Sequence, residues 1–322
     1  MVENKDEHIV NLDEAPSRRW HFLSGYTEEI NDLFACYLND FSGEEAIFEG
    51  LSFYKEHIVS DEYLEEIDYI ASISRYSADQ VLIANLYYDV LKFYFGCTAF
   101  AFASDKGVLH ARNLDWHTDN NLLGKHSMIF NFQKEGKTLF KTVGWPGFIG
   151  ALSGTKRQKF SVTLNAVLSA DKPELATPIS FFLRDVLTSA NSYEEAQRQL
   201  ETTTIASDCL LLLSGTNQDE LAVIERTPTR FATRLPDSDF VVVTNDYKKL
   251  ENVQLSESVL QSTSCGRYDR ASDLLNTSRP TNEKACLEIL QDDAVMMGIT
   301  VQQMVFNTTS GEIELRKTGS MD

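Results

Sequence analysis

The chain has 322 residues, of which 43% are hydrophobic and 24% charged, a composition typical of a globular protein with a sizeable core. No stretch of about 18 apolar residues is present, so the sequence predicts no membrane-spanning helix. The formal net charge of −19 argues against nucleic acid as a partner, because phosphates would be repelled.

The negative charge is concentrated in the first part of the chain. Residues 1–96 contain 20 acidic and 6 basic side chains, a balance of −14, whereas residues 97–322 contain 28 and 23, a balance of −5. The first twenty residues are acidic where a secretory signal is basic and then apolar. We therefore expect no secretory signal and a cytoplasmic protein.

The first 96 residues have the pattern of helices. Apolar residues recur at three- and four-residue spacing over 26–39, 43–58, 61–74 and 78–95. Ser77 precedes Ala-Asp-Gln and is a plausible helix N-cap. Strand patterns are nearly missing from this part of the sequence, so it predicts an all-helical segment over residues 1–96.

From residue 97 the apolar period changes to two. Short strand-like runs, separated by turn residues, occur at 98–104, 127–134, 159–166, 209–215, 220–226 and 239–245. Helical patterns occur at 178–190, 192–202, 267–277 and 282–292, and a final hairpin turns at Ser310-Gly311. Ser192 and Glu195 have the spacing of a capping box. This order predicts a layered α+β domain over residues 97–322, with sheets between helices.

The cysteines and histidines have no metal-binding pattern. The five cysteines are widely spaced without a CxxC pair, and the six histidines include no HExxH. We expect no structural disulfide, and no metal or organic cofactor. His110, His117 and His126 are interpreted as ordinary residues.

Gly96-Cys97-Thr98 lies where the helical pattern ends and the first strand pattern begins. A cysteine at a newly made N-terminus has an α-amine with a pKa of about 8 beside a thiol with a pKa of about 8.5, so the amine can act as the base for the thiol. Glycine before it permits the strained backbone needed for attack on the preceding carbonyl. By composition alone, however, a cysteine in this apolar setting is more often an inert core residue.

Arg112 and Asp115 follow within ARNLDW. An aspartate near the new terminus can accept a charge-assisted hydrogen bond from an α-ammonium, and an arginine beside a thiol favours the thiolate. Alone, two such residues are more often a surface ion pair than part of an active site.

With these residues in place, GCTAFAFASDKGVLHARNLDW resembles the start of the mature chain in the acid ceramidase and N-acylethanolamine acid amidase branch of the choloylglycine hydrolase family. The resemblance continues in order through GFIGALSG, FSVTLNA, SYEEAQRQL, LLSGTNQ and VVTNDY to the C-terminal hairpin. It implies an N-terminal-nucleophile hydrolase. The implied fold is α+β, an αββα sandwich of two stacked antiparallel sheets. Residues 1–96 resemble the shorter chain that such enzymes cut off, which would stay attached as a non-covalent subunit.

The resemblance also implies the reaction and its first three residues. Cys97 matches the nucleophile, freed by cleavage after Gly96, and its α-amine would be the base. Arg112 and Asp115 match the pair that orients and activates it. The implied substrate is a small-molecule N-acyl amide with a lipid-like acyl group, cleaved through a thioester.

Three further positions match site residues of the family. Asn245 matches an asparagine that helps to bind the tetrahedral oxyanion, and Asn165 a second polar group at that site. Without the resemblance, either asparagine would be interpreted as a turn residue at a strand end. Arg267 matches a basic residue near the nucleophile, and Arg270 is a close competitor for that role.

Several alternatives stay open at this point. Gly-Cys-Thr and the two arginines after Asn245 also resemble isopenicillin N acyltransferase-like proteins, so an acyltransferase, or a penicillin or bile-salt amidase on the same fold, is the first alternative. An uncleaved, catalytically idle binding homologue is the second. Ala99 replaces the serine common at this position in lysosomal members. Six aromatic residues would line an acyl pocket or belong to the ordinary core: Phe93, Tyr94, Phe95, Trp116, Trp145 and Phe148. The oligomeric state is not predicted.

Overall fold

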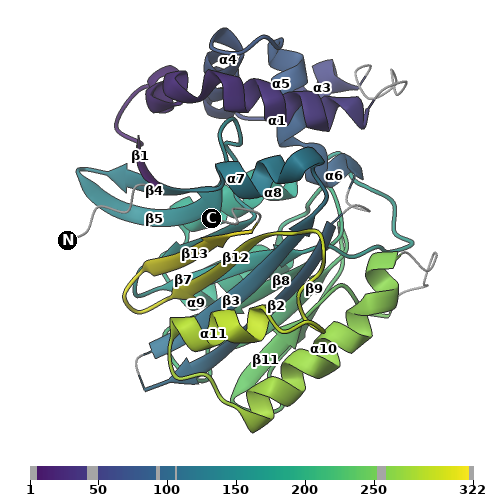
Figure 1. Cartoon of the computed structure of the whole chain (residues 1–322). Helices are drawn as coiled ribbons and strands as arrows, with labels where there is room; N and C mark the ends of the chain where they lie inside the picture. The colour runs from purple at the N-terminus through teal and green to yellow at the C-terminus, as the bar shows by residue number, and fades with distance from the viewer. Residues whose placement is uncertain (1–5, 42–49, 92–94, 106, 252–258, 319–322) are drawn as a thin grey trace.

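Two stacked sheets form the centre of the molecule in the computed structural model, which describes residues 6–41, 50–91, 95–105, 107–251 and 259–318 (Figure 1). The larger sheet has the strand order β1-β4-β5-β6-β7-β8-β9-β10, and the smaller one β11-β2-β3-β12-β13. The strands of the larger sheet are β1 (Glu7–Asn11), β4 (Met128–Lys134), β5 (Lys137–Gly144), β6 (Ser153–Lys156), β7 (Phe160–Asn165), β8 (Cys209–Ser214), β9 (Leu221–Arg226) and β10 (Phe231–Arg234). Those of the smaller sheet are β2 (Phe95–Ser104), β3 (Gly107–Trp116), β11 (Phe240–Val243), β12 (Thr300–Asn307) and β13 (Glu312–Lys317).

Helices cover the outer face of each sheet. Helices α8 (Ile179–Ser189) and α9 (Tyr193–Thr202) pack on the larger sheet, and α10 (Val259–Thr277) and α11 (Glu283–Leu290) pack on the smaller one (Figure 1). A short helix, α7 (Leu122–His126), lies between β3 and β4. This is the αββα layering predicted from the sequence. Among the described residues, no helix is both long and apolar enough to cross a membrane.

The N-terminal helices gather at one end of the sandwich (Figure 1). They are α1 (Thr27–Asn39), α3 (Leu51–His57), α4 (Asp61–Ser72), α5 (Ala78–Asn85) and α6 (Tyr87–Leu91). Ser77 caps α5 and forms a capping box with Gln80, as its position predicts. At α9, the Ser192 hydroxyl accepts from Glu195 N, but the Glu195 carboxylate accepts from Asn191 N, so the predicted capping box is only half formed.

Two details of the N-terminal segment differ from the sequence prediction. The segment is not entirely helical, because β1 pairs in parallel with β4 and becomes the edge strand of the larger sheet. The helix predicted over 78–95 extends too far: α6 ends at Leu91, residues 92–94 lie outside the described residues, and Phe95 already belongs to β2, where it pairs with Trp116. Part of the helix predicted over 43–58 also lies outside the described residues, and α3 covers the rest.

The alternation of β2 decides which way its side chains point. Phe100 and Phe102 join a hydrophobic cluster with α10 and α11, whereas Ala99 and Ala101 pack between the two sheets. Because successive strand residues face opposite sides, Cys97 lies on the same face as the two alanines, inside the sandwich.

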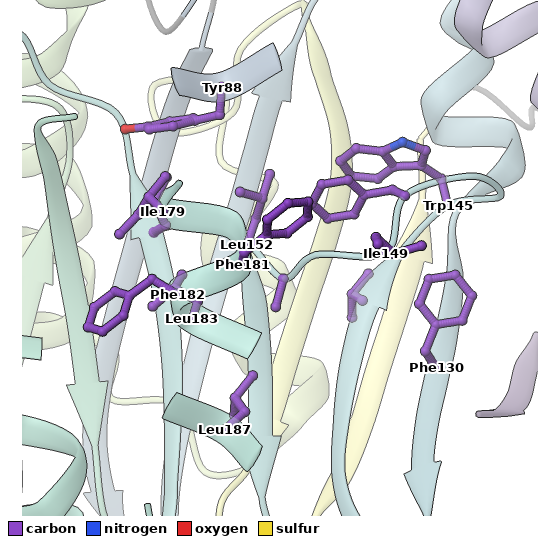
Figure 2. Packing of buried hydrophobic residues seen from close by; sticks show 14 of the residues in the cluster. Tyr88, Phe130, Trp145, Ile149, Leu152, Ile179, Phe181, Phe182, Leu183 and Leu187 are labelled. Atoms are coloured by element: carbon purple, nitrogen blue, oxygen red, sulfur yellow. The ribbon is translucent and has the colours of Figure 1, made fainter. Parts of the chain in front are cut away.

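The N-terminal helices share one hydrophobic core with the larger sheet and α8. Figure 2 shows part of it, with Trp145 and Ile149 of the loop between β5 and β6 and Phe181 and Leu183 of α8 among the side chains drawn. The loop therefore lies among buried apolar side chains next to the N-terminal helices.

Candidate active site

Cys97 lies within an unbroken strand. It is the third residue of β2 and pairs with Leu114, and Gly96 pairs with Asp115. The Gly96–Cys97 bond is thus part of a regular β-ladder rather than a junction between a helix and a strand. The thiol is fully buried, with Sγ 3.2 Å from Nη2 of Arg112 and 3.7 Å from the carbonyl oxygen of Leu164.

Arg112 reaches the thiol from β3, the neighbouring strand. Its Nη2 also donates to the Leu164 carbonyl, and its Nη1 donates to the Leu152 carbonyl at 3.3 Å and to the Ser153 hydroxyl. Burial raises the pKa of the Cys97 thiol, and the Arg112 guanidinium opposes that rise by stabilising the thiolate. The guanidinium therefore makes the thiol easier to ionise than burial alone would allow.

Asp115 lies on the same strand and is fully buried. Its Oδ1 accepts a hydrogen bond from Thr300 Oγ1 at 2.5 Å, and its Oδ2 lies 4.0 Å from Nη1 of Arg267. Within the described part of the chain, Oδ2 accepts no hydrogen bond. Burial raises the pKa of Asp115, and both Arg267 and the bond from Thr300 oppose the rise.

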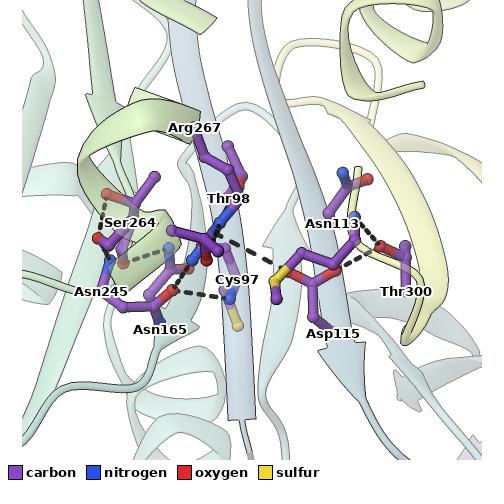
Figure 3. A network of polar contacts seen from close by, with 12 residues as sticks. Cys97, Thr98, Asn113, Asp115, Asn165, Asn245, Ser264, Arg267 and Thr300 are labelled. Atoms are coloured by element: carbon purple, nitrogen blue, oxygen red, sulfur yellow. Dashed lines mark hydrogen bonds and ion pairs between the residues drawn. The ribbon is translucent and has the colours of Figure 1, made fainter. Parts of the chain in front are cut away.

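Asn245 lies at the Cys97 backbone, just after β11 (Figure 3). Its Oδ1 accepts from the Cys97 amide nitrogen at 3.1 Å. Its Nδ2 donates to the Ala166 carbonyl at 2.8 Å, which uses one of the two amide hydrogens. Its own backbone nitrogen donates to Ser264 Oγ at 2.9 Å. The side chain is thereby oriented with its oxygen toward the residue whose nitrogen cleavage would free.

Asn165 ends β7 and is also fully buried. Its Nδ2 donates to the carbonyl oxygens of Val243 and Thr244, at 3.1 and 2.9 Å. Its Oδ1 has no hydrogen-bond partner among the described residues. Both amide hydrogens are thus used by the backbone, so Asn165 would have to release one of them to act as the predicted oxyanion donor.

The two arginines of α10 point in opposite directions. Arg267 is buried and donates to the Cys97 carbonyl at 2.7 Å, to Thr98 Oγ1 at 2.8 Å and to Asn245 Oδ1 at 2.7 Å. Burial lowers the pKa of Arg267, opposed by Asp115. Arg270 is exposed and pairs with Asp292, with Nη2 2.6 Å from Oδ2. Of the two candidates, the structure brings only Arg267 to the site.

Sequence reasoning missed the residues that orient this group. Thr300 binds Asp115, Ser153 binds Arg112, and Ser264 binds Asn245. Ser153 stands in GFIGALSG, a segment that carries the resemblance, and could have been found there. Thr300 is 185 residues from Asp115 and has no local signal, and Ser264, 19 residues from Asn245, lies in no motif that carries the resemblance.

Three of the six aromatic residues considered for an acyl pocket, Trp116, Trp145 and Phe148, are buried. Trp116 and Trp145 meet edge to face with ring centroids 5.4 Å apart, and Trp145 stacks on Phe148 at 4.4 Å. Trp116 also lines a cavity that includes Thr300. Phe93 and Tyr94 lie outside the described residues, and the side chain of Phe95 is likewise not described.

The histidines lie apart from the thiol contacts. His110 is buried between the sheets, bonded to Ser214 and Thr163, and burial lowers its pKa to about 3. Over the described ranges, no group of three or more His, Cys, Asp or Glu side chains could bind a metal ion.

The assembled groups suit nucleophilic chemistry at a carbonyl. With Asp115 ionised, two guanidinium groups face one carboxylate in a buried space, so a thiolate at Cys97 would balance the charge. The same cluster contacts the nitrogen and the carbonyl oxygen of Cys97. A nucleophile, charge-stabilising donors and an oriented nitrogen therefore lie within one network.

The chain is similar to one described protein family and to several named proteins. Residues 102–300 match the family described as acyl-coenzyme A:6-aminopenicillanic acid acyl-transferase. The chain is 28% identical over 250 residues to the acid ceramidase of Heterocephalus glaber, a match that covers 68% of this chain and 62% of that protein. That match thus spans less than two thirds of the relative. This chain is also 27% identical over 331 residues to the N-acylethanolamine-hydrolyzing acid amidase of Caenorhabditis elegans, a match that covers 93% of this chain and 88% of that protein.

A solved structure agrees with the architecture. The ortholog of N-acylethanolamine-hydrolyzing acid amidase from Caenorhabditis elegans has a TM-score of 0.56 and 24% identity, covering 66% of this chain and 93% of that one. The predicted αββα fold is thereby confirmed. The names of the relatives agree with the predicted enzyme class, an amide hydrolase, which is confirmed at that level. The match to the acyl-transferase family covers more than half of this chain, which has the fold of the N-terminal-nucleophile hydrolases. The chain therefore belongs to the acyl-coenzyme A:6-aminopenicillanic acid acyl-transferase family.

Proposed function

We propose that this protein is made as a precursor, cuts itself between Gly96 and Cys97, and then hydrolyses an N-acyl amide with the freed Cys97. The observation that carries the proposal is the network around Cys97. Arg112 contacts the sulfur, Asn245 the nitrogen and Arg267 the carbonyl oxygen of this one residue. Two buried guanidinium groups and one side-chain amide that contact three different atoms of the same residue are not expected around an inert core cysteine.

Self-cleavage would proceed by transfer of the acyl group from nitrogen to sulfur. The Cys97 thiolate attacks the Gly96 carbonyl carbon, a C–S bond forms, the C–N bond breaks, and the nitrogen takes up a proton to become an amine. Water then opens the thioester, leaving a carboxylate at Gly96 and the thiol at Cys97. Asn245 Oδ1, which accepts the amide hydrogen before cleavage, would accept a hydrogen of the amine afterwards.

Turnover would use the same atoms. The α-amine takes the thiol proton, the thiolate attacks the substrate carbonyl, and the second hydrogen of Asn245 Nδ2 stabilises the oxyanion. The protonated amine then gives its proton to the leaving amine, and water releases the acid from the thioester. Arg112 favours the thiolate, and Asp115 compensates the charge of Arg267.

The N-terminal segment would remain bound as a subunit after cleavage. Glu66 of α4 forms a fully buried ion pair with Arg184 of α8, with oxygen–nitrogen distances of 2.5 and 2.7 Å. The segment also shares a hydrophobic core with the larger sheet. Separating the two chains would expose the buried ion pair and the hydrophobic core to water. This supports an enzyme in which the two chains stay bound to each other. A cytoplasmic location stays a prediction from the sequence.

The substrate proposed is an N-acyl amide with an apolar acyl group, as the names of the relatives suggest. The test is to incubate the protein with N-acylethanolamines of several chain lengths and a ceramide, and to measure the acid released. Cys97→Ala is the control. Acid release by wild type alone, with an acyl thioester detected on the Cys97 peptide after acid quenching, supports the proposal. Equal release by the variant contradicts it.

Acyl transfer to an amine is the second candidate, favoured by the description of the matching family. Both reactions share the thioester and differ in what attacks it. Adding 6-aminopenicillanic acid to the same assay separates them. An acylated amine formed at the expense of free acid indicates a transferase, and unchanged acid release indicates a hydrolase.

A further inference from the structure

Asn85 connects the N-terminal segment to the loop between β5 and β6. It is the last residue of α5 and is 1% exposed. Its Nδ2 donates to the Gly147 carbonyl at 3.0 Å, and its Oδ1 accepts from Ile149 N at 2.9 Å. One side chain thus satisfies a backbone acceptor and a backbone donor of the loop. Gly147 has φ +88°, in the left-handed region, so the turn between these two bonds depends on a glycine and on this asparagine.

The same loop has a second attachment to the N-terminal segment. The Ile149 carbonyl accepts from Arg184 Nη1 at 3.0 Å, and the same guanidinium donates to both carboxylate oxygens of Glu66 of α4 through Nη1 and Nη2. Both backbone polar groups of Ile149 are therefore fixed by residues 66 and 85, one directly and one through Arg184. The loop has little freedom at this residue while the segment is in place.

The far end of the loop binds Arg112. The carbonyl of Leu152 and the hydroxyl of Ser153 both accept from Arg112 Nη1, whose partner nitrogen Nη2 lies 3.2 Å from Cys97 Sγ. Between Ile149 and Ser153, Ala151 N donates to the carbonyl of Ser180 at 2.9 Å, and the Ser180 hydroxyl donates to the Asn85 carbonyl at 3.3 Å. A displacement at Asn85 would therefore reach the short stretch of backbone that holds the Arg112 guanidinium.

We propose that Asn85 is a positioning residue of the site: it fixes the loop between β5 and β6 and, through Leu152 and Ser153, places the Arg112 guanidinium at the Cys97 thiol. The N-terminal segment is then required for the geometry of the site, both before and after cleavage. The consequence for catalysis rests on the proposed function, whereas the effect on the thiol itself does not.

A matched control exists in the same segment. Asn31 of α1 is also a buried asparagine, but its side chain accepts from Arg75 N, within the segment itself. Asn31→Ala removes a partly buried hydrogen bond that does not involve the loop, whereas Asn85→Ala removes two buried bonds to it. A purely structural role for Asn85 predicts that both alanine variants behave alike.

The first experiment measures the rate of chain cleavage against pH for wild type, Asn85→Ala and Asn31→Ala, with thermal unfolding to verify folding. We expect Asn85→Ala to cleave on the order of 10- to 100-fold more slowly, the loss typical of a misplaced catalytic group, with its midpoint moved to higher pH. Asn31→Ala should keep the wild-type midpoint. Equal midpoints in all three proteins, or equal losses in both variants, would overturn the proposal. If Asn85→Ala does not fold, Asn85→Asp, which keeps the acceptor for Ile149 N, takes its place.

Two further measurements separate this proposal from the proposed function. If wild type does not cleave at all, the function fails, and the positioning role is tested on the intact chains by the pH titration of the Cys97 β-carbon in protein labelled with ¹³C-cysteine. A higher midpoint in Asn85→Ala than in wild type and Asn31→Ala supports it, and equal midpoints overturn it. In either case, the shifts of the pH midpoint caused by Asn85→Ala and by Ser153→Ala should be less than additive in the double variant, because both residues act through Arg112. Additive effects would contradict the proposed path.

Discussion

The amide nitrogen of Cys97 donates to Oδ1 of Asn245 over 3.1 Å, although 148 residues separate the two in the chain. Strand pairing explains the contact, because β11 pairs with β2 through Val243 and Ala99, which places the next turn of the chain beside Cys97. In the proposed reaction this nitrogen becomes the amine that acts as the base. Asn245 thus already contacts the future base in the uncleaved chain.

Arg267 and Arg270 offer a comparison within one helix. Arg267→Gln removes bonds to Cys97, Thr98 and Asn245, whereas Arg270→Gln removes only a surface pair with Asp292. We expect Arg267→Gln to reduce the cleavage rate by on the order of 100-fold or more, as for loss of a charge-stabilising donor, and Arg270→Gln to leave it nearly unchanged. Time courses of cleavage on denaturing gels measure both. Equal rates for the two variants would remove Arg267 from the site.

The pH dependence of cleavage should respond to Arg112. Burial raises the pKa of the Cys97 thiol, and Arg112 opposes the rise. Loss of the guanidinium in Arg112→Leu raises the thiol pKa further, so less thiolate is present at a given pH and the rising limb of the rate profile moves to higher pH. Arg112→Lys, which keeps a charge, should move it less. A profile of Arg112→Leu that coincides with wild type would show that the contact has no effect on the thiol.

The pair of Glu66 and Arg184 should be required for stability. Glu66→Gln leaves a buried guanidinium without its charge partner, and we expect a loss of about 3–5 kcal/mol in the free energy of unfolding. Glu62→Gln is the control, because Glu62 contacts Arg19 in the same region but is half exposed. Its expected loss is at most about 1 kcal/mol. Urea unfolding of both variants measures this, and similar losses in the two would show that burial of the pair is not decisive.

His110 should make the fold sensitive to acid. Its pKa is lowered to about 3 by burial, so the folded state keeps it neutral while the unfolded chain takes up a proton near pH 6.5. The neutral form's contribution is complete above pH 6.5 and is lost as pH falls toward 3, at about 1.4 kcal/mol for each pH unit. The free energy of unfolding of wild type and His110→Gln between pH 7 and 4.5 measures it. Curves that stay parallel across this range would refute the assignment.

The sequence located the part of the site that is local along the chain. Cys97, Arg112 and Asp115 stand on two consecutive strands, so their spacing already places them together, and the resemblance added Asn165, Asn245 and Arg267. The residues that were missed bind across long intervals: Thr300 is 185 residues from Asp115, and Asn85 is 62 residues from Gly147. Only tertiary structure brings such pairs together.

Two of the strands that the alternation pattern did not identify, β3 and β1, were missed for different physical reasons. β3 is buried over most of its length, including His110, Arg112 and Asp115, so both of its faces lack the polar side that produces alternation. β1 is a short edge strand of five residues in a segment dominated by helices, and its partner β4 is more than a hundred residues away in the chain. Whether residues 1–96 act as a separate subunit stays a prediction.

The most direct test of the central claim is the intact mass and N-terminal sequence of purified wild-type protein beside Cys97→Ala. Two pieces from wild type, the larger beginning Cys-Thr-Ala, with the variant remaining whole, is the predicted result. A wild-type protein that stays a single chain at both mildly acidic and neutral pH would contradict the account, because Cys97 would then have no α-amine to act as its base.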